Sequence, residues 1–340
     1  MSELRWDPLD RTWTLIATER GRRPSDFIPP ERKLAALERT PCPFCLVLEG
    51  HGPSTRIAER RTAGDGVLVL ANRFPALAVE APTERRQVGP YDQMSGVGAH
   101  EVVVETRHHE RSLRDLPPEQ IAAVLLTWRD RIIDLQRDRR IQHVEVFKND
   151  GPGAGATLEH AHSQIIATPI RPPRLMRQIK AAKNHWHTKE RCLVCDIVAF
   201  ETADATRVID SEGDYFAWCP YASRYPFEVE LTSRRHSAYF SMLGDEQALS
   251  LARLLSRTMR ALDVALRGAD LNLCLSLTPS TQSFTRGRDG LEQIEQFWHW
   301  RIELIPRLLP LGGFELGTDL IINPTAPEAA AAHLRSLIAR

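Results

Sequence analysis

The chain has 340 residues, and its 44 lysines and arginines are balanced by 44 aspartates and glutamates. This length favours two domains or two fused halves over one compact domain. The balanced charge argues against a general nucleic-acid-binding surface. The first residues lack the apolar run of a signal peptide, and no stretch approaches the roughly 18 apolar residues of a membrane span. We therefore expect a cytoplasmic protein that binds neither nucleic acid nor membrane.

The first half of the chain alternates strand-like and helix-like segments. In chain order, the apolar patterns predict strands at 67–70 and 101–104, a helix over 117–135, a strand at 144–147, a glycine-rich loop at 151–157 and a strand through His160.

The second half repeats a similar order of elements. The predictions are a strand at 227–231, a helix over 251–266, a strand at 271–275 and a strand at 299–303. A Cys-x-x-Cys pair precedes each half's strands, which favours duplication over a chance likeness. The prolines after Arg171 mark the junction, so we predict an N-terminal half over 1–175 and a C-terminal half over 176–340.

The sequence His160-Ala161-His162-Ser163-Gln164 is the most informative motif. Residues two apart on an extended strand point to the same face, so two imidazoles and one amide share a surface. The glycine-rich loop upstream lets backbone N–H groups approach a phosphate closely. This arrangement suits phosphoryl chemistry, and the alternative is a strand that only holds a metal or is merely hydrogen-bonded.

Read with Asn149-Asp150-Gly151, this motif resembles the active-site stretch of the galactose-1-phosphate uridylyltransferase family. That family is a branch of the histidine-triad superfamily, whose nucleotidyl-transferring members carry His-x-His-x-Gln. The resemblance continues through the segments 5–8, 20–24, 42–45, 72–77, 300–303 and 312–315. It implies an α+β fold of two fused histidine-triad-like halves, each a twisted antiparallel sheet with packed helices. It also implies a homodimer with the active site near the subunit interface.

Four of the six cysteines lie in Cys-x-x-Cys pairs, which indicates metal ligands rather than disulfides. A zinc site normally takes four thiolate or imidazole ligands. The resemblance implies a structural zinc held by Cys42, Cys45, His109 and His160, with His108 as the competing neighbour of His109.

A second zinc site is implied at Cys192, Cys195 and His236. Related branches carry His-Trp-His-Ile-Glu on the later strand, and the second histidine is the fourth ligand there. This chain has Arg301 at that position, and arginine cannot bind metal. His299 is the candidate replacement; water, Glu303 and an empty site are the alternatives.

The resemblance implies that His162 is the nucleophile of a two-step nucleotidyl transfer with ping-pong kinetics. Gln164 would donate an amide hydrogen bond to a phosphoryl oxygen, and this favours transfer over hydrolysis because the amide is no proton donor.

Seven residues match substrate-binding positions of the family. The resemblance places phosphate contacts, the nucleoside pocket and the sugar hydroxyls at Arg20, Arg23, Asn149, Thr157, Asn72, Phe74 and Glu315, with Asn323 as a further sugar-pocket candidate. The basic segment 20–23 alone would be interpreted as a solvated turn, and Glu315 alone as an ordinary loop carboxylate.

These observations predict an enzyme that moves UMP from UDP-glucose to a hexose 1-phosphate of the galactose 1-phosphate type. The alternatives are an ADP-glucose phosphorylase that uses inorganic phosphate, a histidine-triad nucleotide hydrolase, and a non-enzymatic zinc module. The base, the sugar and the acceptor are not decided by the sequence.

Overall fold

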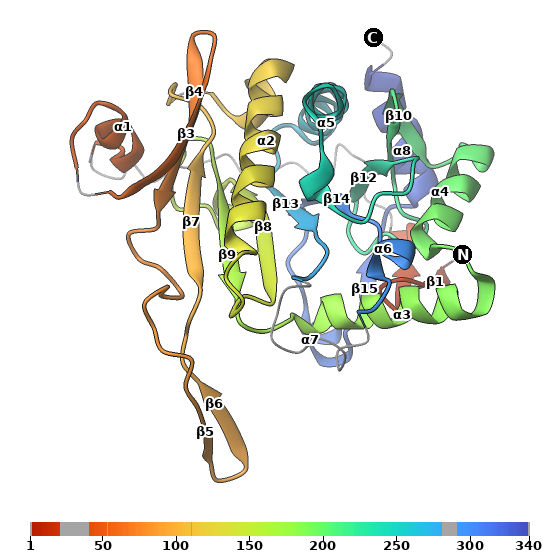
Figure 1. Cartoon of the computed structure of the whole chain (residues 1–340). Coiled ribbons are helices and arrows are strands. Elements are labelled where there is room, and N and C mark those ends of the chain that lie inside the picture. The colour runs from red at the N-terminus through yellow and green to blue at the C-terminus, as the bar shows by residue number, and fades with distance from the viewer. Residues whose placement is uncertain (1, 21–40, 53, 110, 281–290, 339–340) are drawn as a thin grey trace.

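The computed structural model describes residues 2–20, 41–52, 54–109, 111–280 and 291–338 (Figure 1). A ten-stranded sheet runs through its centre, and all neighbouring strands in it are antiparallel. In spatial order the strands are β10 (Val208–Glu212), β11 (Tyr215–Trp218), β12 (Val229–Ser233), β14 (Arg301–Pro306), β13 (Leu271–Ser276), β8 (His143–Asp150), β9 (His162–Thr168), β7 (Ala99–Val104), β4 (Asp65–Ala71) and β3 (Arg56–Thr62).

Each half of the chain supplies five of these strands with the same connectivity. In both halves the fifth strand in sequence lies between the third and the fourth, and a long helix links the third to the fourth. These helices are α2 (Pro118–Leu135) and α5 (Asp245–Leu266). The predicted α+β class with antiparallel halves is confirmed. The sequence did not show that β8 and β13 pair with each other and merge both sheets into one.

One face of the sheet is covered by α2, α5 and α8 (Pro327–Ile338) (Figure 1). The helix α5 buries one apolar side throughout its length, and Leu251, Leu255 and Leu262 are at most 4% exposed. This spacing of three and four residues is the period that predicted the helix. The same core holds Trp128 of α2 and Leu334 of α8.

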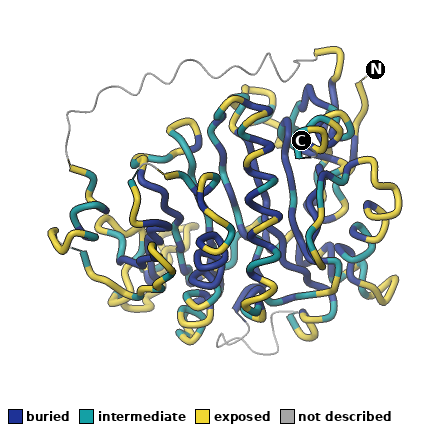
Figure 2. The backbone as a smooth tube through the Cα atoms, turned by 90° about the horizontal axis from the view of Figure 1, so that it is seen from above, coloured by how far each residue is buried: buried dark blue, intermediate teal, exposed yellow. Residues whose placement is uncertain are grey.

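In the described part of the chain, helices cover the opposite face at its two ends. The short helix α1 (Pro43–Leu48) packs on β4 and β7, while α3 (Pro173–Lys189), α4 (Leu193–Asp204) and α6 (Ile294–Phe297) enclose a second core at the other end. Figure 2 shows how burial is distributed along the backbone. The middle of this face, on β8, β9 and β13, keeps half-buried side chains.

The first residues of the chain and a short strand that precedes α8 form a small separate sheet. Strands β1 (Glu3–Asp7) and β2 (Thr12–Ile16) form a hairpin, and β15 (Ile321–Asn323) pairs with β2 in parallel. A second hairpin, β5 (Arg85–Val88) and β6 (Tyr91–Met94), projects from the body between β4 and β7 (Figure 1). None of the described helices combines the length and apolarity that a membrane crossing requires.

Short elements complete the chain: the helix α7 (Gly313–Thr318) and the 3₁₀ turns η1 (Thr18–Arg20), η3 (Leu113–Asp115), η4 (Pro152–Ala154) and η5 (Phe240–Met242).

Several predicted boundaries shift by a few residues. The strand predicted through His160 begins at His162, and the strand predicted from His299 begins at Arg301. In each half, therefore, a histidine lies two residues before its strand. The strand predicted from residue 227 begins at Val229, because Phe227 has a positive φ of 60° that no strand residue adopts. The division at residue 175 remains a prediction.

Replacing Leu255 by alanine tests the shared core of α2 and α5. Leu255 is fully buried, so the substitution removes apolar contacts and leaves a cavity. We expect the free energy of unfolding to fall by about 3 kcal/mol in urea titration. Val264→Ala on the same helix, whose side chain is 63% exposed, should change it by less than about 0.5 kcal/mol. Equal effects of the two variants would contradict the packing described here.

Candidate functional site

His162 opens β9 with one ring nitrogen already engaged. Its Nδ1 lies 2.8 Å from the carbonyl oxygen of His160, and because a carbonyl only accepts, Nδ1 carries the proton and donates. The lone pair of the neutral ring is therefore on Nε2. Burial, with the nearby charge of Lys148, lowers the pKa of His162 to about 4. The imidazole is thus uncharged at neutral pH and able to act as a nucleophile.

A buried ion pair lies behind His162. The Nζ of Lys148 donates to Glu105 Oε2 at 2.8 Å and to the carbonyl of His162 at 2.9 Å. Lys148 shares the α2-facing side of β8 with Val144 and Val146, and both partners of the pair are almost fully buried. Sequence reasoning missed this pair, although a lysine that alternates with buried valines requires an acidic partner.

Gln164 follows His162 on the same face of β9, as the alternation predicts. The intervening Ser163 points the other way and accepts a hydrogen bond from Trp128 Nε1 of α2 at 2.8 Å. The Nδ1 of His100 accepts the N–H of Ala76 at 3.2 Å, so its Nε2 carries the proton and donates to Oε1 of Gln164 at 2.8 Å. Asn72 lies beside the same ring, with Nδ2 3.0 Å from Nε2. The structure thereby brings two predicted site residues, Gln164 and Asn72, to a histidine that the sequence analysis did not select.

The glycine-rich loop leaves β8 directly after Asn149 and Asp150. Gly151 and Gly155 both have φ of +91°, which L side chains rarely adopt, and this explains the glycines at the two ends of the turn η4. Asn149 is half-buried and lies on the sheet face that also carries Gln164. Phe147, two residues before Asn149 on β8, is the register partner of Gln164 on β9, so the three side chains point the same way. Thr157 is exposed beyond the turn.

The first predicted metal cluster is assembled. Cys42, Cys45, His109 and His160 place one ligand atom each within 4.8 Å of all the others. Cys45 Sγ lies 3.5 Å from Nδ1 of both His109 and His160. His160 Nε2 donates to the carbonyl of Thr106 at 2.8 Å, so its Nδ1 presents a lone pair to the thiolates. His108 is exposed and lies outside the cluster.

The second cluster consists of Cys192, Cys195, His236 and His299. Cys195 Sγ lies 3.2 Å from His236 Nδ1 and 3.5 Å from His299 Nδ1. The Nε2 of His236 donates to the carbonyl of Glu295, and that of His299 lies 3.0 Å from Ser233 Oγ. His299 therefore occupies the fourth position that the sequence left open.

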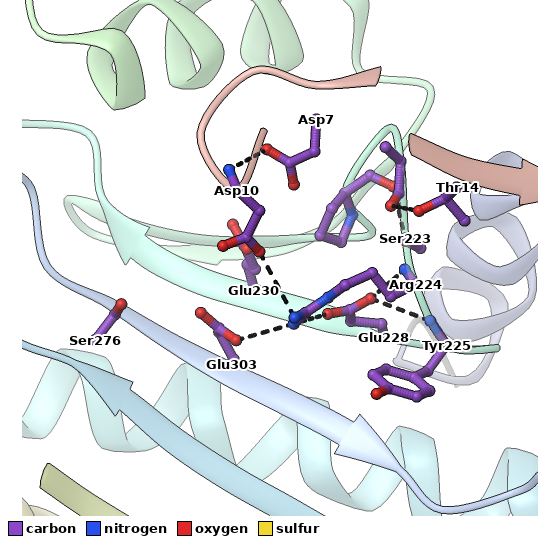
Figure 3. Close-up of polar contacts among 12 residues, drawn as sticks. Asp7, Asp10, Thr14, Ser223, Arg224, Tyr225, Glu228, Glu230, Ser276 and Glu303 are labelled. Atoms are coloured by element: carbon purple, nitrogen blue, oxygen red, sulfur yellow. Dashed lines mark hydrogen bonds and ion pairs between the residues drawn. The ribbon is translucent and has the colours of Figure 1, made fainter. Parts of the chain in front are cut away.

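Arg301, which departs from the family pattern, and Glu303 belong to a buried ion-pair network. Arg174 bridges Glu303 and Asp10 with four hydrogen bonds of 2.8–3.0 Å. Arg224 contacts Glu303 at 3.3 Å and Glu228 at 2.9 Å (Figure 3). Glu303 is thus fully engaged by guanidinium groups and is not a metal ligand.

This network also lowers the pKa of Glu303. Burial raises that pKa, but the charges of Arg174 and Arg224 lower it more, so the pKa lies below its ordinary value and the carboxyl is ionised at neutral pH. Asp10 comes from the turn between β1 and β2, so the network attaches the first residues of the chain to the second half.

Other predicted substrate residues are exposed or engaged with partners other than His162. Arg20 is exposed at the end of η1, Phe74 is 81% exposed, and Glu315 accepts a hydrogen bond from the N–H of Gly312 at the start of α7. Arg23 falls outside the described residues. Within the described part of the chain, no hydrogen bond or ion pair connects Arg20, Phe74 or Glu315 to His162.

Asn323, the further sugar-pocket candidate, has backbone partners, and its role in a sugar pocket stays a prediction. It is fully buried, donates to the carbonyl of Ser223 at 2.8 Å and accepts from the N–H of Thr325 at 2.9 Å. Its amide is used to fix β15, which is a structural role.

Comparison with known proteins places this site in a family. The model of the galactose-1-phosphate uridyl transferase N-terminal domain matches residues 1–172, half of the chain. The chain belongs to the galactose-1-phosphate uridylyltransferase family. It is therefore an enzyme, a nucleotidyltransferase.

Two relatives match along nearly the whole chain. The ADP-glucose phosphorylase of Arabidopsis thaliana is 29% identical over 338 residues, covering 98% of this chain and 93% of that protein. The galactose-1-phosphate uridylyltransferase of Thermotoga maritima is 27% identical over 342 residues, covering 98% of both. A crystal structure of the Arabidopsis phosphorylase with bound ADP-glucose superimposes with a TM-score of 0.79 at 27% identity, covering 98% of this chain and 99% of that one.

The network around Glu303 should be costly to disrupt. Glu303→Gln removes a fully buried negative charge that faces the half-buried guanidinium groups of Arg174 and Arg224, so we expect the free energy of unfolding to fall by about 2 kcal/mol. Glu246→Gln, at an exposed position of α5, is the matched control and should change it by less than about 0.5 kcal/mol. A Glu303→Gln protein as stable as the control in urea titration would show that the network contributes no stability.

Proposed function

We propose that the enzyme transfers a nucleoside monophosphate from a nucleoside diphosphate sugar to a phosphate-bearing acceptor through a covalent intermediate on His162. The observation that carries this proposal is the tautomer of His162. Its Nδ1–H is held by the carbonyl of His160, so Nε2 is the nucleophilic atom of a neutral ring. Gln164 lies on the same face of β9.

The reaction has two displacements. In the first, Nε2 of His162 attacks the α-phosphorus; a phosphorus–nitrogen bond forms, the bond to the bridging oxygen breaks, and sugar 1-phosphate leaves with the electron pair. In the second, a phosphate oxygen of the acceptor attacks the same phosphorus, and the electron pair of the phosphorus–nitrogen bond returns to His162. The sugar 1-phosphate leaves before the acceptor reacts, and the nucleotidyl group stays on His162 between the two steps. This order of events gives ping-pong kinetics.

Gln164 supports transfer over hydrolysis in this scheme. Its amide N–H₂ group can donate to a phosphoryl oxygen but supplies no proton to a leaving group. The Oε1 atom is taken up by His100, at 2.8 Å, so the N–H₂ group is the end that remains for the phosphate. A histidine-triad hydrolase is therefore the less favoured alternative.

For the donor and acceptor we propose UDP-glucose and a hexose 1-phosphate of the galactose 1-phosphate type. The Thermotoga relative, which carries the uridylyltransferase name, matches 98% of both chains. The second candidate is ADP-glucose with inorganic phosphate as the acceptor. The likeness to the Arabidopsis phosphorylase, at 29% identity and a TM-score of 0.79 to its ADP-glucose complex, favours that alternative.

We infer that both cysteine–histidine clusters hold zinc. Two thiolates and two imidazole Nδ1 atoms are the donor set that tetrahedral zinc prefers. Zinc–sulfur and zinc–nitrogen bonds of ordinary length place sulfur and nitrogen about 3.5 Å apart in a tetrahedron, as observed from Cys45 to His109 and His160. A closed set of four protein ligands gives the metal a structural role. Held there, His160 fixes the backbone that carries the carbonyl bonded to His162.

We also infer a homodimer with the active site near the subunit interface, as the resemblance to the family implies. The exposed Arg20 and Phe74 are compatible with it.

The covalent step can be observed directly. Brief incubation with UDP-glucose and no acceptor should add the mass of UMP to the intact protein, and His162→Asn should abolish the adduct. An AMP-sized adduct from ADP-glucose in a parallel sample would assign the second candidate. No adduct from either donor, in a protein with its full metal content, would refute the proposed mechanism.

Metal analysis tests the clusters separately. We expect about two zinc ions per chain in the native protein, and about one in either Cys45→Ser or Cys195→Ser, because each variant loses one of the two clusters. Cys219→Ala is the control, since Cys219 is buried in the core outside both clusters. Unchanged zinc content in the two serine variants would contradict the assignment.

A further inference from the structure

The second half of the chain reaches directly into the glycine-rich loop of the first. Asn272 on β13 is the register partner of Asn149 on β8. Its Nδ2 donates two hydrogen bonds of 2.9 Å, one to the carbonyl oxygen of Ala154 in the loop and one to Oδ1 of Asn149. These contacts cross the boundary between the two halves.

The two contacts determine how both amides are turned. The carbonyl of Ala154 can only accept, so the atom of Asn272 that faces it is the nitrogen. The second hydrogen of that nitrogen then points at Asn149, so the facing atom there is the oxygen. The Nδ2 of Asn149 lies on the other side, 3.4 Å from the carbonyl of Gly155. This second backbone carbonyl independently requires nitrogen at that position.

Asp270 fixes the loop from the same strand end. Its Oδ2 accepts the N–H of Gly153 at 2.5 Å. A Cβ atom at Gly151 would collide with this carboxylate, and one at Gly153 would lie 2.7 Å from Oδ2. The close approach of Asp270 therefore explains why both positions are glycine.

We propose that Asn272 is a positioning residue for the transfer reaction. It holds the amide of Asn149 in the orientation that offers N–H₂, rather than the carbonyl oxygen, to the phosphate of the nucleotide donor. This inference rests on the proposed function and on the phosphate contact that the resemblance to the family implies for Asn149.

The physical reason is the sign of the partial charge that faces the phosphate. An N–H₂ group attracts a phosphoryl oxygen, whereas an amide oxygen repels it. Without Asn272, only the longer 3.4 Å contact with the Gly155 carbonyl would distinguish the two ends of the Asn149 amide, so the reversed orientation would be populated more often. Asn272 removes that freedom before substrate arrives, which is the preorganisation that favours a charged transition state.

The role of the second half follows from this placement. Arg301 and Glu303 stand where the first half has His162 and Gln164, so the described C-terminal strands carry no equivalent of the nucleophile. Their contribution to the reaction is the strand β13, which supports the phosphate loop.

A double-mutant cycle tests the proposal. The rate constant of adduct formation on His162 is measured by rapid quench and intact-mass detection in the native enzyme, Asn272→Ala, Asn149→Ala and the double variant. We expect Asn272→Ala to lower the rate about tenfold and Asn149→Ala to lower it more. The double variant should react as slowly as Asn149→Ala alone, because Asn272 acts through Asn149. Asn272→Asp, which keeps the shape but cannot donate, should lower the rate at least as much as alanine.

Three controls separate orientation from damage to the fold. Asn184→Ala, an exposed asparagine of α3, should keep the native rate. The zinc content and the unfolding midpoint of Asn272→Ala should match those of the native enzyme. The positioning role would be overturned by an undiminished rate in Asn272→Ala. It would also be overturned if Asn272→Ala lowered the rate tenfold both in the native enzyme and in the Asn149→Ala variant. Either result would leave the covalent mechanism intact. Absence of an adduct in the native enzyme would overturn both.

Discussion

The antiparallel pairing of β8 with β13 is the contact on which the rest of the molecule depends. It joins the two halves into one continuous sheet, and its register sets Asn272 opposite Asn149 and Cys274 opposite Phe147. A slip of one residue would send every side chain of β13 to the other face. The glycine-rich loop would then lose its support from Asn272. A long apolar layer under α2, α5 and α8 holds this register, because β8 and β13 both bury alternate side chains in it.

The start of the last strand in each half is fixed by a cluster of cysteines and histidines. Each cluster combines a Cys-x-x-Cys pair, a histidine before the long helix and a histidine before the last strand. In the first half this convergence sets the carbonyl that holds His162. In the second half the same frame leads to Arg301 and Glu303, and Arg174 links Glu303 to Asp10 near the start of the chain. One architecture thus supports the proposed nucleophile in one half and attachment of the N-terminal residues in the other.

Much of this could be predicted from sequence. The α2 and α5 helices follow from their apolar spacing, and alternation along His162, Ser163 and Gln164 correctly places their faces. The merged sheet could not be predicted, because strand order depends on contacts far apart in sequence. The Lys148–Glu105 pair and the Asn272 contacts were missed for the same reason. Asn323 was assigned by resemblance to a pocket, but its amide is consumed by backbone partners.

The stereochemical course at phosphorus tests the central claim most directly. A donor whose α-phosphorus is made chiral by sulfur and isotopic oxygen is converted with an acceptor, and the configuration of the product is determined by ³¹P NMR. Two in-line displacements, one by His162 and one by the acceptor, each invert the centre, so the account predicts net retention. Net inversion would mean that the acceptor attacks the donor in a single step, and the covalent role assigned to His162 would be wrong.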